Sequence, residues 1–188
     1  YLDSYKKQGL NEGISENIIN VTGNPIVDII NDNQKIFDSG GEYLDDKILD
    51  FIKNDNFTLT TSHRRENILD QKSLTNIVNL LNKSENKIIF PMGYKTQEML
   101  KEFNLDLKSN ILVTDPIGYL EFMYLMKNSD YVVSDSGTVV EEACIIGKPS
   151  IQMRHSTERP EVYDVGSSIK FDPSEDIKDF EDYINKVH

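Results

Sequence analysis

The chain has 188 residues and carries 20 lysines and arginines against 32 aspartates and glutamates, a formal net charge of −12 at neutral pH. This acidity excludes a protein that wraps the nucleic-acid backbone, but it allows a small phosphorylated ligand held by a few local donors. A single cysteine excludes a disulfide framework within the chain and fits a reducing cytoplasm. No apolar run reaches the ~18–20 residues that span a membrane, and no signal peptide opens the chain. We therefore expect a cytoplasmic protein without membrane or nucleic-acid partners, and the start at Tyr1 suggests a piece of something longer.

The first third of the chain predicts one strand and two helices. A β-branched run at residues 17–22 predicts a short strand, which ends at Gly23-Asn24-Pro25. Pro25 suits the first position of a helix that continues through Ile30. A second helix is expected over residues 42–53, where apolar side chains recur at helical spacing. The glycine pair between these helices, Gly40-Gly41, is interpreted as a boundary or hinge.

From Phe57 onward strands and helices are predicted to alternate. Apolar, β-branched runs predict six strands, at residues 57–61, 87–91, 110–114, 131–134, 150–153 and 168–171. Helix-length stretches lie between or after them, at residues 69–82, 96–103, 119–127, 139–146, 159–165 and 174–187. This alternation is typical of parallel βαβ units, and strands apolar along their whole length predict a sheet covered on both faces. We expect a Rossmann-like, doubly wound parallel α/β sheet over residues 56–188, with residues 1–55 as a leading appendage.

Ligands of such folds bind at the carboxyl ends of the strands, so the residues that follow each strand are the candidates. Ser136, Gly137 and Thr138 lie between an apolar strand and an apolar helix, where backbone N–H groups and the helix dipole favour an anion. An ordinary helix N-cap explains the same residues. The segment lacks a P-loop lysine and a dinucleotide glycine pattern, so neither type of cofactor is implied. Glu142, in the first turn of this helix, is a candidate acceptor for sugar hydroxyls such as a ribose diol.

Two cationic clusters also follow predicted strands. His63 follows the first strand and suits either a phosphate contact or proton transfer, with a solvated loop residue as the plainer reading. The adjacent Arg64 and Arg65 favour the functional reading, because a guanidinium fork fits phosphate. Arg159 stands at a predicted helix start, where a cation is unfavourable unless an anion joins it, which makes it a phosphate candidate.

Other chemistries find little support. The histidines are scattered and the cysteine is single, so no metal site is expected. Cys144 lies on an apolar helix and is predicted to be core, and nothing resembles a nucleophile elbow. Tyr119 begins an apolar helix that is predicted to pack in the core, although this tyrosine could lie near a nucleobase.

Five segments, taken in order, resemble the non-hydrolysing UDP-N-acetylglucosamine 2-epimerases. They are Val-Thr-Gly-Asn-Pro at residues 21–25, with Asp28 following; Thr-Thr-Ser-His-Arg-Arg-Glu-Asn at 60–67; Asp-Ser-Gly-Thr at 135–138, with Glu141-Glu142; Gly-Lys-Pro at 147–149; and Thr-Glu-Arg-Pro-Glu at 157–161. Each segment is weak alone, but the ordered set is specific and covers essentially the whole chain.

The resemblance implies the C-terminal domain of a glycosyltransferase-B-like two-domain enzyme that converts UDP-GlcNAc to UDP-ManNAc by eliminating UDP and adding it back. In the family this half holds the UDP, so the implied contacts are His63, Arg64, Ser136, Gly137, Thr138, Glu142 and Arg159. His63 and Arg159 would stabilise the departing diphosphate and are the implied catalytic residues. No cofactor or metal is implied, and the acid/base carboxylates belong to an N-terminal domain that this chain lacks. We therefore expect the chain alone to be inactive, and the full-length protein to be a homodimer.

Two departures from the family pattern are visible. Thr138 stands where relatives often have a second glycine, and Gly93 stands where they usually have a histidine. Tyr94 or Lys95 would have to supply whatever that imidazole does. The alternatives are an epimerase of a deoxy UDP-HexNAc, a glycosyltransferase-B-type transferase, and a free-standing nucleotide-sugar-binding module.

Overall fold

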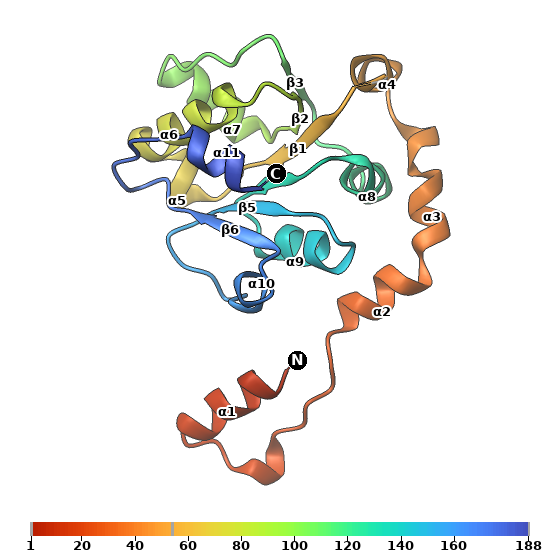
Figure 1. Cartoon of the computed structure of the whole chain (residues 1–188), viewed down its shortest axis with the longest axis vertical. Helices are drawn as coiled ribbons and strands as arrows, with labels where there is room; N and C mark the ends of the chain where they lie inside the picture. The colour runs from red at the N-terminus through yellow and green to blue at the C-terminus, as the bar shows by residue number, and fades with distance from the viewer. Residues whose placement is uncertain (1, 54, 188) are drawn as a thin grey trace. The chain divides into compact units, whose positions relative to one another are not determined.

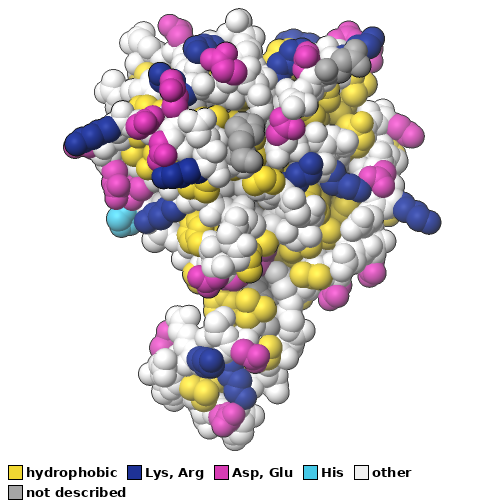
Figure 2. Space-filling view, in the orientation of Figure 1, with side chains coloured by type: hydrophobic (Ala, Val, Ile, Leu, Met, Phe, Trp, Pro, Cys, Tyr) yellow, Lys and Arg dark blue, Asp and Glu magenta, His cyan; other side chains and the backbone are white. Residues whose placement is uncertain are grey.

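The computed structural model describes residues 2–53 and 55–187. The chain divides into two compact units, Tyr1–Gln34 and Lys35–His188. None of the helices described is both long and apolar enough to cross a membrane. On the face drawn in Figure 2, cationic and anionic side chains intermingle, so the net negative charge is not gathered into one block there.

The first unit contains α1 (Asp3–Asn11), the 3-10 helix η1 (Glu16–Ile18) and α2 (Pro25–Asp32). Pro25 is confirmed at the start of α2, and the Asn24 side chain caps this helix by accepting from the Ile26 N–H at 3.1 Å. The predicted strand at residues 17–22 is wrong, because η1 takes its first residues and the remainder is irregular. A β-branched run forms a strand only when a neighbouring strand pairs with it, and all six strands described lie in the second unit.

The second unit opens with α3 (Gln34–Asp38), all but the first residue of which belongs to this unit, the 3-10 helix η2 (Ser39–Tyr43) and α4 (Asp46–Ile52). The helix expected from residue 42 begins four residues later, because the Asp45 side chain caps α4 by accepting from the Lys47 N–H at 2.7 Å. The boundary expected at Gly40-Gly41 falls elsewhere, because the two units divide between residues 34 and 35. A Cβ on Gly40 would overlap the Leu120 carbonyl of α8 (Tyr119–Asn128), so glycine is needed here for close packing within one unit.

The sheet has six parallel strands in the order β3-β2-β1-β4-β5-β6 (Figure 1). The strands are β1 (Phe57–Thr61), β2 (Lys87–Pro91), β3 (Ile111–Thr114), β4 (Val132–Ser134), β5 (Ser150–Met153) and β6 (Ser168–Phe171). Every predicted strand is confirmed within one residue, and so is the doubly wound α/β class. The strand order reverses between β1 and β4, which makes their carboxyl ends the switch point where such folds bind ligands.

Helices cover both faces of the sheet (Figure 1). The remaining ones are α5 (Arg65–Ile68), α6 (Gln71–Lys83), α7 (Tyr94–Glu102), α9 (Gly137–Ile145), α10 (Glu161–Asp164) and α11 (Glu181–Val187). On one face α6, α7 and α11 share a core with alternate strand residues such as Ile88 and Phe90. α11 begins seven residues later than predicted, because the Asp179 side chain accepts from the N–H groups of Glu181 and Asp182 and sets the helix start there.

Candidate functional site at the switch point

The loops after β1 and β4 lie next to each other at the carboxyl edge of the sheet. Thr61, the last residue of β1, pairs in register with Ser134, the last residue of β4. The residues that follow, Ser62 and His63 on one side and Asp135 and Ser136 on the other, therefore emerge together. This is where sequence reasoning placed its candidate residues.

Asp135, in the loop after β4, forms hydrogen bonds that connect this loop to the loop after β1. Its side chain is 0% exposed, and its carboxylate accepts from Ser62 Oγ at 3.0 Å, Asn67 Nδ2 at 3.3 Å and the backbone N–H groups of His63 and Arg64 at 3.0 and 2.9 Å. Arg64 also donates from its side chain, through Nε, to the backbone carbonyl of Asp135 at 2.9 Å. Sequence reasoning saw Asp135 only as part of a helix start and missed this role, because all of these partners lie about seventy positions away in the sequence.

His63 and Arg64 are brought to the site as predicted, but with different surroundings. The His63 side chain is 58% exposed, and its Nδ1 lies 3.5 Å from the Asp135 carboxylate. The Arg64 guanidinium lies 3.2 Å from Glu66 and 3.8 Å from Glu158. Arg65 begins α5 and is exposed. The site therefore presents one accessible imidazole and one guanidinium already flanked by carboxylates.

The start of α9 lies opposite these cations. Ser136 is the N-cap, and its hydroxyl accepts from the Val139 N–H at 3.4 Å, which confirms the N-cap reading. Gly137 is buried and Thr138 is exposed. An N-cap does not compete with anion binding, because a helix start carries several N–H groups without acceptors inside the helix.

A carboxylate from the loop after β5 lies at this helix start. Glu158 accepts from Arg154 Nη1 at 2.5 Å, and it lies so close to Gly137 that a Cβ there would overlap its carboxylate. Burial raises the pKa of Glu158, but a backbone hydrogen bond and the nearby Arg154 and Arg64 lower this pKa by more than burial raises it. The net shift is therefore downward. Sequence reasoning quoted Glu158 only as part of a motif and assigned Arg154 no role.

Arg159 forms an ion pair within the protein. Its Nε lies 2.7 Å from the carboxylate of Glu141, which is buried in the first half of α9. The sequence argument for Arg159 was that a cation at a helix start calls for an outside anion. Glu141 supplies that anion from within the chain, so this argument no longer supports a ligand contact, and the assignment depends on the family resemblance.

Glu142 is held by Tyr119. Glu142 is 6% exposed, and the Tyr119 hydroxyl donates to its Oε1 at 2.7 Å. Burial raises the pKa of Glu142, as does the charge of Glu141, while the hydrogen bond from Tyr119 lowers it. Tyr119 is thus not a core residue as expected but half-exposed beside Glu142, with its ring edge-on to Phe37 at 5.7 Å. The hydrogen bond from Tyr119 thus holds the Glu142 carboxylate in one orientation.

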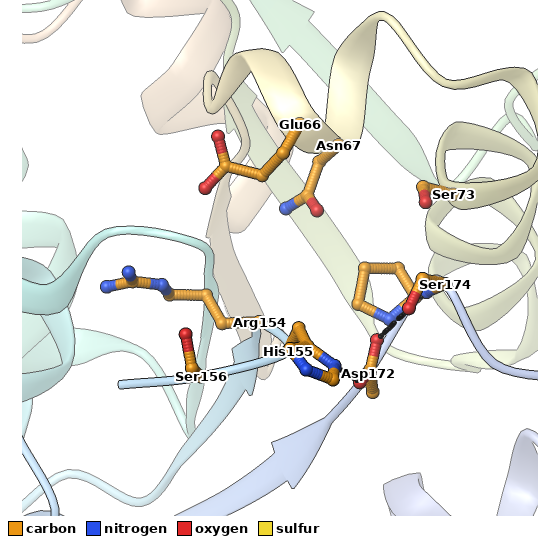
Figure 3. A pocket seen from close by; sticks show the side chains of 9 residues that line it. Glu66, Asn67, Ser73, Arg154, His155, Ser156, Asp172 and Ser174 are labelled. Carbon is orange, nitrogen blue, oxygen red and sulfur yellow. Dashed lines mark hydrogen bonds and ion pairs between the residues drawn. The ribbon is translucent and has the colours of Figure 1, made fainter. Parts of the chain in front are cut away.

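A cavity of about 170 Å³ borders the site on the β5–β6 side (Figure 3). Its wall includes Glu66 and Asn67 from α5, and Arg154, whose guanidinium extends away from the His155–Asp172 pair. In that pair His155 Nδ1 lies 2.6 Å from the buried Asp172 carboxylate. None of the predicted site residues lines this cavity, which is smaller than a nucleotide needs.

Gly93 is the N-cap of α7 and has an ordinary φ of −64°. A Cβ at this position would meet no heavy atom within 4 Å, so the backbone does not require a glycine. Of the two neighbours proposed as substitutes for the missing imidazole, Tyr94 is exposed and Lys95 pairs with Glu98 at 3.0 Å.

Within residues 2–53 and 55–187, no three His, Cys, Asp or Glu side chains are grouped closely enough to hold a metal ion. Cys144, which was expected in the core, is only partly buried on α9.

Comparison with known proteins identifies the family and the fold. The family model for UDP-N-acetylglucosamine 2-epimerase matches residues 2–182. A UDP-N-acetylglucosamine 2-epimerase of Methanococcus maripaludis is 41% identical over 85% of this chain and 46% of its own length. The structure of the Methanocaldococcus jannaschii UDP-GlcNAc 2-epimerase in complex with UDP-GlcNAc and UDP superposes with a TM-score of 0.79 at 38% identity, over 98% of this chain and 51% of that one.

A further relative bears a different substrate name. The UDP-2,3-diacetamido-2,3-dideoxy-D-glucuronate 2-epimerase of Pseudomonas aeruginosa is 36% identical over 65% of this chain and 35% of its own length. The chain spans about half the length of the two archaeal epimerases described above. With its fold, its switch-point loops and the match of a family model over nearly all its residues, the chain belongs to the UDP-N-acetylglucosamine 2-epimerase family.

Proposed function

We propose that this chain is the UDP-binding C-terminal domain, residues 56–188 with the leading segment 1–55, of an enzyme that interconverts UDP-GlcNAc and UDP-ManNAc. The observation that carries the proposal is the Asp135 junction. It sets His63 and Arg64 opposite Ser136 and Gly137 at the switch point of a doubly wound sheet. Cations facing a helix start form a site of the kind that binds a diphosphate.

In this site each group has a distinct task. His63, Arg64 and the α9 start with Ser136, Gly137 and Thr138 bind the diphosphate. Glu142, held in place by Tyr119, accepts hydrogen bonds from the ribose hydroxyls, which suits a buried carboxylate better than contact with phosphate. Arg159 reaches the diphosphate while it stays paired with Glu141 through Nε.

The proposed reaction breaks the bond between the anomeric carbon and the diphosphate and takes the proton from C2. The resulting glycal receives UDP again after a proton returns to the other face of C2. His63 and Arg159 stabilise the negative charge that develops on the leaving diphosphate, which is how a preorganised cationic site lowers such a barrier. The proton at C2 is moved by carboxylates of an N-terminal domain. The chain alone therefore binds UDP without turnover, and the full-length protein is a cytoplasmic homodimer.

Calorimetry with UDP tests the binding part of the proposal. We expect saturable binding by this chain, and a loss of about tenfold in affinity for His63→Ala or Arg64→Ala, since each removes a charge-assisted contact. His155→Ala is the matched control, because it removes an imidazole beside another buried aspartate outside the site. If neither this chain nor the whole gene product binds UDP, the assignment is wrong.

A second substrate is favoured by Gly93 together with the Pseudomonas relative. Gly93 lacks the imidazole that the resemblance leads one to expect at this position, and a Cβ there would meet no heavy atom within 4 Å. The Pseudomonas relative is described as acting on a UDP-sugar with two acetamido groups. Incubation of the whole gene product with each UDP-sugar in deuterated water tests the two substrates. The true substrate is the sugar that gains deuterium at C2. With a glycosyltransferase neither sugar gains deuterium, because that enzyme never breaks the C2–H bond. With a free-standing binding module neither sugar gains deuterium either.

A further inference from the structure

The carboxylate of Glu158 lies where an anionic ligand of this site would bind. One oxygen accepts from Arg154 Nη1 at 2.5 Å, and the other lies 3.8 Å from Arg64 Nη2. The same carboxylate fits against Gly137 only because that residue has no Cβ. It thus contacts two guanidinium groups from different loops and the start of α9 at the same time.

These contacts are not those of a buried structural ion pair. The Glu158 side chain is 49% exposed, and it belongs to the irregular segment between β5 and α10. An ion pair with this much solvent contact contributes little to stability, so the carboxylate can leave at small cost. Arg154, by contrast, has only 12% of its side chain exposed and stays at the edge of the sheet.

A bound diphosphate and this carboxylate exclude each other. Both are anions that seek the same donors, and two like charges within a few ångströms of each other repel strongly. A backbone hydrogen bond, together with Arg154 and Arg64, holds the pKa of Glu158 below its ordinary value although burial opposes this, so protonation does not relieve the conflict at neutral pH. The side chain must therefore move away when a diphosphate enters.

We propose that Arg154 is a further diphosphate-binding residue alongside Arg64, and that Glu158 occupies their shared position as an internal anion until the ligand displaces it. The inference rests on the proposed function for the identity of the ligand, a nucleoside diphosphate. It adds two residues that set the affinity of the site. Arg154 binds the diphosphate, and Glu158 competes with the diphosphate for the same donors.

Calorimetry with three probes tests the proposal: UDP, inorganic pyrophosphate and uridine. Glu158→Gln keeps the shape of the side chain and removes its charge. We expect this variant to bind UDP and pyrophosphate about two- to fivefold more tightly than the unaltered chain, the range for a partly exposed ion pair, and to bind uridine equally well. Arg154→Gln should weaken UDP and pyrophosphate by a similar factor. Asp164→Asn, an equal loss of charge on the exposed side of α10, should change neither.

The possible outcomes separate the two claims. Unchanged or weaker binding of pyrophosphate and UDP by Glu158→Gln, with its urea unfolding midpoint near that of the unaltered chain, overturns the internal-anion role. Equal gains for Asp164→Asn also overturn it, since the effect would then come from net charge alone. If the unaltered chain fails to bind UDP while Glu158→Gln still gains affinity for pyrophosphate, the proposed nucleotide function fails and the displacement stands. If no variant binds either anion, both fail.

Discussion

Replacing Asp135 by asparagine tests whether one buried carboxylate organises the whole site. The substitution preserves size, but it turns one acceptor oxygen into an NH₂ group that faces backbone N–H donors. Asp135 accepts from two such groups, those of His63 and Arg64, and from the side chains of Ser62 and Asn67. Hydrogen bonds to a charged group contribute about 1.5–3 kcal/mol each, and a buried donor left unpaired costs a further 1–3 kcal/mol. Because these effects overlap, we expect a loss of about 3–5 kcal/mol in the free energy of unfolding.

That loss is large against the ~5–15 kcal/mol total stability of a typical domain. Guanidinium unfolding measures it, with Ser62→Ala as the matched control, because that variant removes only one of the same hydrogen bonds and should cost about 1.5–3 kcal/mol. Hydrogen exchange adds a local measurement: the His63 and Arg64 amides should lose protection in Asp135→Asn and keep it in Ser62→Ala. A loss in Asp135→Asn no larger than that in Ser62→Ala, with both amides still protected, would refute the reasoning.

Three further predictions concern single residues. Burial is the chief cause that raises the folded-state pKa of Glu142 above its ordinary value of 4.5. The contribution of Glu142 to the free energy of unfolding is therefore highest below pH 4.5 and falls as the pH rises through the raised pKa. Glu142→Gln should therefore match the unaltered chain at about pH 4 and be more stable at about pH 8 in urea unfolding; an equal difference at both pH values would contradict this. Gly40→Ala should cost about 1–3 kcal/mol in the same assay, because its Cβ would overlap the Leu120 carbonyl, whereas a true hinge would tolerate it. Gly93→His should change stability by less than about 0.5 kcal/mol, since the added Cβ meets no heavy atom within 4 Å; a larger loss in thermal unfolding would contradict this.

The strands were predictable because the sheet is covered on both faces. Ile88, Ile89 and Phe90 are all buried although successive side chains point to opposite faces, and this produces the uninterrupted apolar runs visible in the sequence. Helix starts were less predictable, since they depend on which of several polar side chains caps the helix. Asp45 and Asp179 each do so, several residues beyond the predicted start.

For the candidate site residues, position in the fold was predictable where chain topology alone decides it. His63 and Ser136 each follow the end of a parallel strand, and adjacent parallel strands bring such residues to the same edge of the sheet. Prediction failed for partners set by long-range contacts. The sequence offered Arg159 as an unpaired cation, while the folded chain pairs it with Glu141.

The sequence by itself determined the alternation of strands and helices, and hence a doubly wound sheet and the edge at which the candidate residues gather, because these follow from hydrophobic periodicity and the geometry of parallel crossovers. Only the tertiary structure decided which charged groups neutralise one another at that edge. Asp135 fastens two loops, Glu141 pairs with Arg159, and Glu158 lies between Arg64 and Arg154. Electrostatic pairing acts through space over a few ångströms, and no spacing along the chain reports which of 52 charged side chains come that close.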